Sequence, residues 1–296
     1  MRESLSLHRT ADRPDEGHLH LHLHGKRTHI DRRAEGIDGS AVLSRPSSAP
    51  DWVSDFYDRK GQASGPSGVL EHHRERAAAI GRFGGKSSGR VLELGAGAGG
   101  SAVATAELGY DVVAVELSTV RADFAKDLSS RSGRLAVDVL HGDFMQVELP
   151  GRFDAVTYWN GFGVGSDSEQ RTLLHRIAED WLAPDGVAVL DVFNPLAWCR
   201  EAGTMDVDSE TNCRQAVDFD AVTSRMVDTW WFDGEDKPPL SQSQRCYSPA
   251  DLALLLEGTG LTMVRAEVDG TSLDMVGPGA DGPLGKAWGY RVLLGR

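Results

Sequence analysis

The sequence has little cysteine and no long apolar run, and each absence excludes a class of protein. Its three cysteines, Cys199, Cys213 and Cys246, form no CxxC pair. Neither a disulfide framework nor a zinc site is therefore indicated, and a reducing, cytoplasmic setting fits. No run of about 18 apolar residues occurs, and the N-terminus lacks the apolar segment of a signal peptide, so membrane spanning and secretion lack support.

Positive charge is also scarce. The chain of 296 residues has 31 Lys and Arg against 44 Asp and Glu, a formal net charge of −13. Basic residues that displace counterions supply most non-specific affinity for nucleic acid, so no nucleic-acid partner is expected. With 40% hydrophobic and 25% charged residues, the composition is that of a soluble globular protein with one large domain or two small ones.

Residues 1–50 contain scarcely an aromatic side chain and hold eight basic and seven acidic residues, so the net acidity belongs to the rest of the chain. Such a segment cannot bury enough apolar surface to offset the entropy of ordering, and we expect a disordered tail. Four alternate histidines within it could bind a divalent metal, although a solvated tail with adventitious affinity is the favoured interpretation. They are His18, His20, His22 and His24.

Beyond the tail, the hydrophobic pattern alternates between helical and strand-like segments. Trp52, Phe56 and Tyr57 and then residues 69–83 predict two short helices within residues 51–88. Apolar strands alternating with helices then predict an α/β fold, with a mostly parallel sheet covered on both faces. We expect strands at 90–94, 111–116, 135–140, 153–159 and 186–192, and helices at 99–108, 118–129 and 168–182.

The alternation breaks near residue 200. A strand-like stretch rich in aromatics over 211–247 predicts an antiparallel insertion, within about 200–247. Trp230 and Trp231 lie on opposite faces of their strand, so at most one can line a pocket. Ser248, followed by proline, predicts a helix N-cap, and strands at 262–268 and 287–294 complete the sheet.

The strongest chemical signal is VLELGAGAGG at residues 91–100, an apolar strand that ends in a glycine turn and runs into a helix. Glycines let a ligand approach the backbone, and a helix N-terminus supplies N–H donors, so a nucleotide-like ligand is indicated. The string also satisfies GxGxxG through Gly95, Gly97 and Gly100. An NAD(P)-dependent oxidoreductase therefore remains an alternative.

Three acidic side chains accompany this turn. Glu93 lies two residues before the first glycine, where a carboxylate repels pyrophosphate but attracts an ammonium or sulfonium group. Glu116 ends the next strand, 19 residues beyond Gly97, where it can accept the ribose hydroxyls; dinucleotide folds use an acid there too. Asp143, 27 residues after Glu116, precedes Phe144, and the pair can bind the amino group and face of an adenine.

With these residues in order, the chain resembles the class I S-adenosylmethionine (SAM) dependent methyltransferases over residues 89–296. The segment FDAVTYWNGF at 153–162 resembles the family's fourth motif, and LAPDG at 182–186 resembles its turn before the fifth strand, with Asp185 for a glycine. The resemblance implies a Rossmann-like sheet with an antiparallel last strand and SAM as co-substrate, with no metal required. It also implies cofactor-binding roles for Glu93, Gly95, Ala96, Gly97, Glu116, Leu117, Asp143, Phe144 and Asn160.

The N-terminal helices, residues 51–88, and the late insertion resemble those of small-molecule methyltransferases, loosely the glycine N-methyltransferase group. The resemblance implies a helical lid and a substrate-side insertion that form the acceptor pocket. The candidate catalytic residues are Asn160 and Asp191, at the carboxyl ends of strands, and Tyr57 from the lid. Asp191 could instead cap the next helix. Because no catalytic base is apparent, N-methylation of an amine is favoured over O-methylation, since a hydroxyl needs a base.

Three hypotheses follow. The first is a SAM-dependent methyltransferase acting on nitrogen or oxygen of a small molecule, including a peptide terminal amine. The amino-acid composition of the chain, rich in Gly, Ala, Asp and Arg, resembles that of proteins from GC-rich actinobacteria, where such enzymes often act in secondary metabolism. The second is the NAD(P)-dependent oxidoreductase, and the third is a non-catalytic protein that binds SAM or metal.

Overall fold

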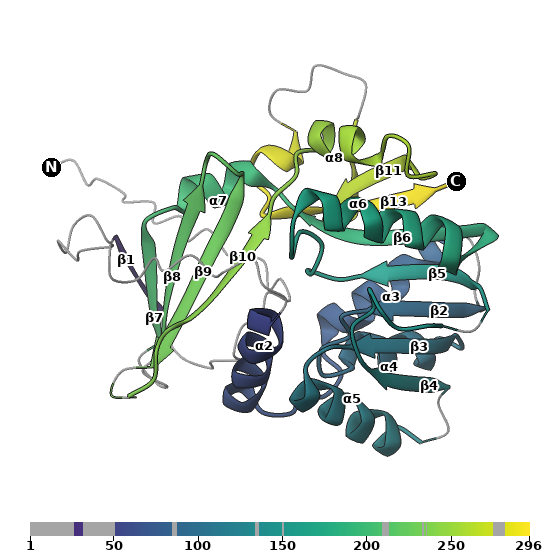
Figure 1. The fold of residues 1–296 in the computed structure, drawn as a ribbon, viewed down its shortest axis with the longest axis horizontal. Coiled ribbons are helices and arrows are strands. Elements are labelled where there is room, and N and C mark those ends of the chain that lie inside the picture. The colour runs from purple at the N-terminus through teal and green to yellow at the C-terminus, as the bar shows by residue number, and fades with distance from the viewer. Residues whose placement is uncertain are drawn as a thin grey trace, which may run out of the picture.

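The computed structural model describes residues 27–31, 51–84, 88–133, 136–149, 151–208, 213–232, 234, 236–274 and 282–296. Two sheets lie side by side in it (Figure 1), a large one flanked by helices and a smaller antiparallel one, with helix α2 between them. Within the described ranges, no helix is long and apolar enough to cross a membrane.

The large sheet has eight strands in the order β12-β11-β13-β6-β5-β2-β3-β4. Neighbours from β6 to β4 pair in parallel, whereas β13 is antiparallel to both β6 and β11. This confirms the predicted mostly parallel sheet with an antiparallel last strand. The strands are β2 (Arg90–Leu94), β3 (Asp111–Glu116), β4 (Val137–His141), β5 (Phe153–Tyr158), β6 (Leu182–Phe193), β11 (Thr262–Val268), β12 (Thr271–Ser272) and β13 (Gly289–Gly295).

Several helices begin directly after a residue whose side chain caps them. The Ser118 hydroxyl accepts the amide of Arg121 at the start of α5, and Ser166 and Ser248 form reciprocal capping boxes at α6 and α8. The predicted N-cap at Ser248 is therefore confirmed. The helices are α2 (Asp51–Ser64), α3 (Glu71–Gly84), α4 (Gly100–Glu107), α5 (Thr119–Arg131), α6 (Asp167–Arg176), α7 (Pro195–Glu201) and α8 (Pro249–Leu256).

One predicted helix is shorter than expected. The pattern predicts a helix over 168–182, but α6 ends at Arg176 and continues only as a π-helical turn, Ile177–Trp181. Strand β6 then begins at Leu182, four residues before the predicted start. The buried side chains of Ile177 and Trp181 explain the mistake, because they continue the apolar periodicity of a helix through the turn.

The smaller sheet has the order β1-β7-β8-β9-β10, with every pairing antiparallel. Its strands are β1 (Arg27–Asp31), β7 (Thr204–Asp208), β8 (Cys213–Asp220), β9 (Arg225–Phe232) and β10 (Leu240–Arg245). The predicted antiparallel insertion is therefore present, and it begins one strand earlier than the 211–247 stretch. Strand β1 pairs with β7 inside the segment expected to be a disordered tail; the rest of residues 1–50, including the four histidines, lies outside the described residues.

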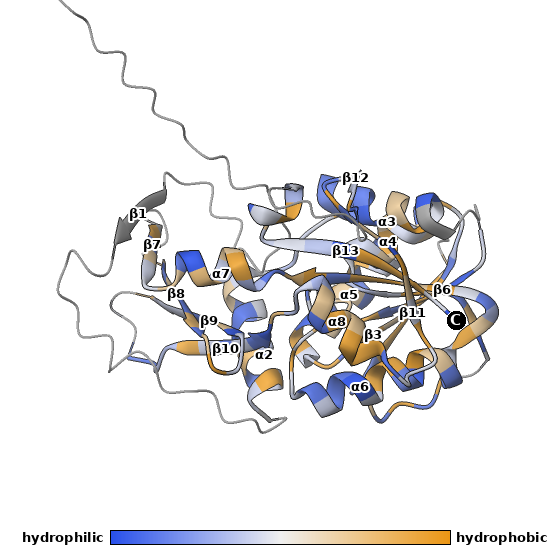
Figure 2. Cartoon of the chain, turned by 90° about the horizontal axis from the view of Figure 1, so that it is seen from above, coloured by the Kyte–Doolittle hydropathy of each residue, from blue (hydrophilic) through white to orange (hydrophobic). Residues whose placement is uncertain are grey.

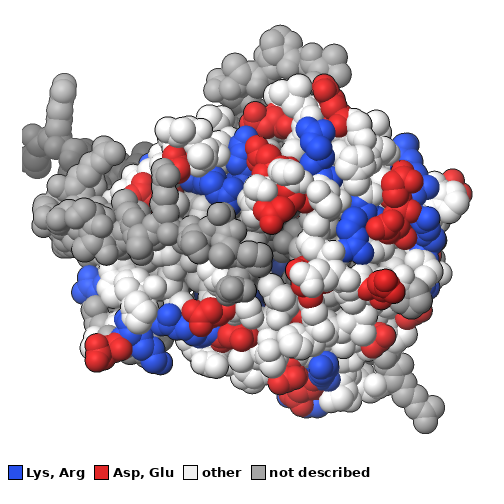
Figure 3. Space-filling model, viewed as in Figure 1, with Lys and Arg blue, Asp and Glu red and all other residues white. Residues whose placement is uncertain are grey.

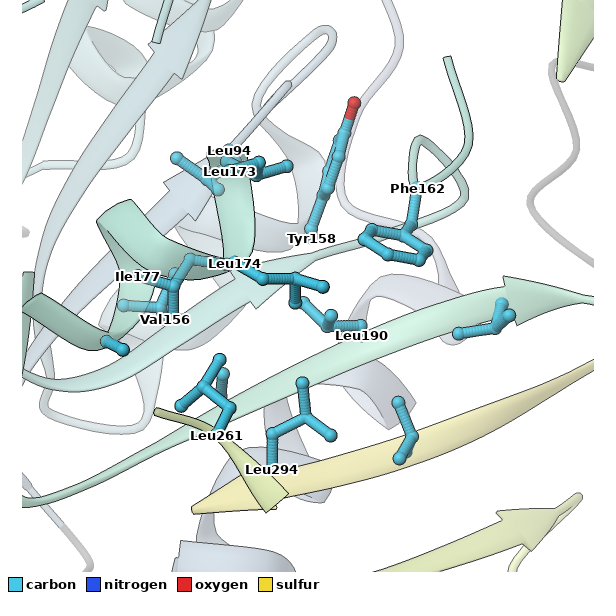
Figure 4. Close-up of a cluster of buried hydrophobic side chains, with 14 of the residues drawn as sticks. Leu94, Val156, Tyr158, Phe162, Leu173, Leu174, Ile177, Leu190, Leu261 and Leu294 are labelled. Atoms are coloured by element: carbon cyan, nitrogen blue, oxygen red, sulfur yellow. The ribbon is translucent and has the colours of Figure 1, made fainter. Parts of the chain in front are cut away.

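A single large hydrophobic cluster fills one face of the eight-stranded sheet under α6 and α8. Figure 4 shows Leu173, Leu174 and Ile177 packed over Val156 and Leu190 of the sheet. Each fully buried side chain of this size contributes roughly 1.5–3 kcal/mol of transfer free energy. In Figure 2 the strands of the large sheet are largely hydrophobic, whereas the outer surface of α6 is hydrophilic. This packing fixes the carboxyl ends of β2, β3 and β5 relative to one another.

Candidate functional site

The glycine turn joins the central strand β2 to α4. Gly95, Gly97 and Gly99 have φ angles of 61°, 58° and 84°, in the left-handed region that side chains disfavour. A Cβ on Gly99 would lie 2.9 Å from the Cα of Ala125, so this glycine lets α5 pack against the turn. The amide of Ala96 donates to the Val115 carbonyl at 3.1 Å, which ties the turn to β3. The turn therefore presents bare backbone at the carboxyl edge of the sheet.

The third glycine of the GxGxxG string has a packing role. A Cβ on Gly100 would overlap the imidazole ring of His73, which comes from α3. His73 Nδ1 also accepts the backbone amide of Leu70 at 3.0 Å. The ring of His73 therefore fills the space between α3 and α4.

Glu116 joins the glycine turn to the end of β3. Its Oε2 accepts the amide of Gly97 at 2.7 Å and its Oε1 accepts the amide of Ser118 at 2.8 Å, and the residue is buried. Charged acceptors make strong hydrogen bonds to backbone amides. Leu117 follows it, with its carbonyl 3.1 Å from Nε2 of His141. The structure therefore brings together two segments that the sequence assigned to one ligand.

Glu93 lies below the turn as a buried acid that lacks a full set of partners. Its exposed fraction is 1%, and within the described residues its Oε2 makes no hydrogen bond. Burial raises the pKa of Glu93 to about 8, although the charge of Arg76 and the side chain of Trp159 act to lower it. A buried carboxyl of this kind is stabilised in its charged form by a nearby cation.

Asp143 and Phe144 lie beyond the end of β4. Asp143 Oδ1 accepts the amide of Met145 at 2.8 Å, and the ring of Phe144 meets that of Tyr158 edge-on, with centroids 5.4 Å apart. Tyr158 itself packs against Gly95, where a Cβ would lie 3.1 Å from its ring. Figure 4 shows its hydroxyl pointing away from the hydrophobic cluster against which the ring packs.

Tyr158 is a site residue that the sequence did not single out. Burial and the nearby charges of Glu116 and Asp143 raise the pKa of its hydroxyl well above the ordinary value, so it stays protonated and can donate a hydrogen bond. A Cβ on Gly161 would overlap the Tyr158 ring, so the next turn also packs on it. The only signal available in the sequence is a polar aromatic at the last position of a buried strand.

Tyr57 lies on α2 and connects the lid to the smaller sheet. Its hydroxyl donates to Oε1 of Gln242 at 3.2 Å, and the guanidinium carbon of Arg121 lies 4.8 Å from its ring centroid. Burial raises the pKa of Tyr57 to about 12, so it is a donor and not a base near neutral pH. Asp58 accepts the hydroxyl of Ser118 at 2.5 Å, which docks α2 on the start of α5.

The candidate catalytic residues from the two strand ends occupy different surroundings. Asn160 follows β5 with a left-handed φ of 54°, and its carbonyl accepts Nε2 of Gln244 at 3.0 Å. Asp191 in β6 pairs with Arg291 at 2.9 Å and with Arg76 at 3.6 Å. The interpretation of Asp191 as a helix cap is wrong, because the side chain of Asn194 caps α7.

A pocket of about 310 Å³, counting the space open to solvent at its mouth, lies between the smaller sheet and the end of β5. Its apolar walls are Phe193, Trp198, Met226 and Trp230, and its polar lining consists of Asn160, Gln215, Asp228, Gln242 and Gln244. Trp230 lines it and Trp231 does not, as the alternation along the strand predicts. Neither Tyr57 nor Asp191 is among its lining residues.

Comparison with known proteins identifies the large-sheet domain. A family described as a methyltransferase domain matches residues 91–186, the segment that contains the glycine turn, Glu116 and Asp143. The chain contains a class I, SAM-dependent methyltransferase domain. It is also 35% identical over 114 residues to the cypemycin N-terminal methyltransferase of a Streptomyces species, a match that covers 38% of this chain and 45% of that protein. The chain therefore spans less than half the length of this curated relative.

Solved structures show the same methyltransferase fold. The CcbJ methyltransferase from Streptomyces caelestis matches with a TM-score of 0.64 and 22% identity over 82% of this chain and 95% of that one. A SAM-dependent methyltransferase from Clostridium acetobutylicum ATCC 824 matches with a TM-score of 0.61 and 12% identity over 82% and 97% of the two chains. At these identities the similarity establishes the fold alone.

The methyltransferase domain offers groups that fit SAM. SAM carries a sulfonium, an ammonium, two ribose hydroxyls and an adenine, and the turn supplies glycines without side chains at 95 and 97 beside the buried, incompletely bonded Glu93. Glu116 and Asp143 stand at the ends of the next two strands. Across the part of the chain that the structure describes, no group of three or more His, Cys, Asp or Glu side chains could hold a metal.

Proposed function

We propose that the chain transfers a methyl group from SAM to nitrogen or oxygen of a small molecule or peptide, with an amine nitrogen preferred. The observation that carries this proposal is the juxtaposition, at one edge of the sheet, of the left-handed glycine turn, the buried Glu93 carboxyl and the pocket that begins at Asn160. Ligands of open α/β sheets bind outside the carboxyl ends of the strands, where all three features lie.

In this proposal the cofactor lies along the ends of β2, β3 and β4. Glu93, Gly95, Ala96 and Gly97 hold its methionine part, with the Glu93 carboxylate facing positive charge. Glu116 and Leu117 hold the ribose. Asp143 and Phe144 bind the adenine, and Asn160 lies beside the transferred methyl group.

Bound SAM supplies an electrophilic methyl group on a positively charged sulfur. The protein's own contribution is to hold the acceptor in line with that methyl and to keep water out, an effect worth up to roughly 7–11 kcal/mol. A hydroxyl acceptor also needs a base near it. The nine residues that line the pocket include no His, Lys or Tyr, and their one titratable side chain is the Asp228 carboxyl.

The lid, the tail and the insertion have proposed parts in this function. We assign residues 51–88 to a lid, 89–296 to the methyltransferase domain and about 200–247 to the substrate-side insertion; of the predicted tail at residues 1–50, β1 joins the smaller sheet. The similarity to an N-terminal methyltransferase supports a peptide terminal amine among the acceptors, and we propose a place in secondary metabolism. Figure 3 shows acidic and basic side chains interspersed on the face seen in Figure 1. We propose a cytoplasmic protein that acts on neither nucleic acid nor membrane.

The deciding experiment measures binding and then turnover. S-adenosylhomocysteine (SAH), the demethylated product, should bind the full chain in calorimetry and raise its unfolding temperature, whereas NADH should not. Incubation with SAM and panels of amines and phenols, read by mass spectrometry, should give products heavier by one methylene. Protection by NADH without protection by SAH would favour the oxidoreductase. SAH binding without turnover of any acceptor would favour the non-catalytic alternative.

A further inference from the structure

Asp228 is a buried acid on β9 at the centre of the pocket's polar lining, with an exposed fraction of 4%. Its Oδ1 accepts Nε2 of Gln215 at 2.9 Å, and its Oδ2 accepts Nε1 of Trp230 at 2.7 Å and Nε2 of Gln242 at 3.0 Å. A carboxylate has about four acceptor positions. Three are used, and one remains available to a donor in the pocket.

Two neighbouring carboxamides also offer acceptor oxygens to the pocket. Gln215 and Gln244 are each more than nine-tenths buried, and each uses its Nε2 in a hydrogen bond, to Asp228 and to the Asn160 carbonyl. Within the described residues the Oε1 atom of neither side chain makes a hydrogen bond, and both residues line the pocket. Each carboxamide oxygen is therefore an acceptor that a donor group in the pocket can use.

The lining residues carry no positive charge, and the buried Lys60 ammonium, 3.6 Å from the centroid of the Trp230 ring, is not one of them. Phe193, Trp198 and Trp230 are aromatic and Met226 is apolar, and no Lys, Arg or His lines the pocket. Aromatic faces attract cations, and a desolvated carboxylate is costly without a partner. A group with several N–H donors and a positive charge satisfies the carboxylate, the two amide oxygens and the rings together.

We propose that Asp228 binds the amino group of the methyl acceptor, and that the acceptor is therefore a primary or secondary amine and not a hydroxyl compound. This inference rests on the proposed function. The amine is held as an ammonium and loses one proton to solvent. Its nitrogen lone pair then forms the N–C bond as the C–S bond of SAM breaks, and the positive charge moves from sulfur to the product ammonium, which Asp228 again faces.

The test compares amines with matched neutral compounds on the full chain. Thermal unfolding of the SAH complex is measured with alanine amide, a dipeptide amide and benzylamine, and with N-acetylalanine amide and benzyl alcohol. The amines should stabilise the wild-type complex and the neutral compounds should not. The affinity of the amine that binds best should fall at least about tenfold in Asp228→Asn, the change expected when a charged hydrogen bond is lost.

The control is Asp236→Asn, which removes the same charge from an exposed turn and should leave amine affinity unchanged. Because Asp228→Asn could disturb the sheet, Gln244→Leu serves as a second variant that removes one pocket oxygen and leaves Asp228 in place; it should weaken amine binding several-fold. Equal stabilisation by neutral compounds, no stabilisation by any amine, or unchanged affinity in a folded Asp228→Asn protein would overturn the inference. Failure of SAH to bind the wild type would overturn the proposed function instead.

Discussion

The amide of Gly97 donates to Oε2 of Glu116 at 2.7 Å, across 19 residues of sequence. The same carboxylate accepts the amide of Ser118 with its other oxygen at 2.8 Å. Glu116 therefore organises the glycine turn and the start of α5 in addition to its proposed contact with ribose. A buried amide that loses its acceptor carries a desolvation cost of about 1–3 kcal/mol.

Replacing Glu116 with alanine should weaken SAH binding at least about tenfold, because the ribose acceptor and the acceptor of the Gly97 amide are lost together. Calorimetric titration of the folded variant measures this change. Glu257→Ala, at the exposed end of α8, provides a control that should bind like the wild type. Unchanged affinity in Glu116→Ala would remove the ribose assignment.

The raised pKa of Glu93, about 8 in the folded protein against an ordinary 4.5, predicts a pH-dependent stability. Between these values the folded state holds a proton that the unfolded state has released. The free energy of unfolding should therefore fall as pH rises through this window and level off above it. Urea unfolding at about pH 5.5 and pH 8 measures the slope.

Glu93→Gln cannot ionise and should show a smaller loss of stability over the same pH range. SAH affinity gives an independent measurement, because a cation at Glu93 favours the ionised carboxyl. Wild-type affinity should rise from about pH 6 to pH 9, and that of Glu93→Gln should rise less. Identical pH profiles for the two proteins in both measurements would contradict the role given to this carboxyl.

Gly100→Ala should destabilise the protein by about 1–3 kcal/mol, because the added Cβ overlaps the His73 ring. The double variant Gly100→Ala, His73→Ala removes the clash, so the cost of the glycine substitution should be smaller in the His73→Ala background. A double-mutant cycle from urea unfolding isolates this coupling. An equal cost in both backgrounds would show that Gly100 is not needed to make room for the His73 ring.

Asp191→Asn should lower the free energy of unfolding by about 1–3 kcal/mol, since Arg76 and Arg291 lose their shared carboxylate while Arg291 keeps its pairs with Glu75 and Glu267. Asp127→Asn breaks an exposed pair with Arg131 and should cost about 0–1 kcal/mol. SAH affinity of the folded Asp191→Asn protein should stay close to that of the wild type. A large loss of turnover at full stability would instead support Asp191 as a catalytic residue.

Tyr57→Phe should lower kcat/KM by about three- to tenfold, because it removes the neutral hydrogen bond to Gln242 that joins the lid to the smaller sheet. Steady-state kinetics with SAM and an active amine provide the measurement. A loss beyond about a hundredfold is more than one neutral hydrogen bond supplies, and it would place the Tyr57 hydroxyl on the reacting atoms.

Much of the fold could be predicted because its signals are local. Apolar strands, serine caps and the glycine turn each lie within a few residues, so the order of elements from 89 to 296 followed from periodicity and turn chemistry. The segment after Arg176 could not be predicted, since Ile177 and Trp181 continue a helical pattern that tertiary packing ends in a π-helical turn. The pairing of β1 with β7 joins residues far apart in the sequence, and no local pattern reports such a contact.

By itself the sequence determined the glycine turn and its accompanying acids. The backbone freedom of a glycine and the position of a carboxylate at a strand end depend on residues that are close together in the sequence. Only the tertiary structure decided which side chains share the pocket. Asp228, Gln215 and Gln242 come from three strands, and nothing in the local sequence distinguishes them from other polar residues. Antiparallel pairing places their buried side chains together, where a carboxylate between two carboxamides becomes a binding site.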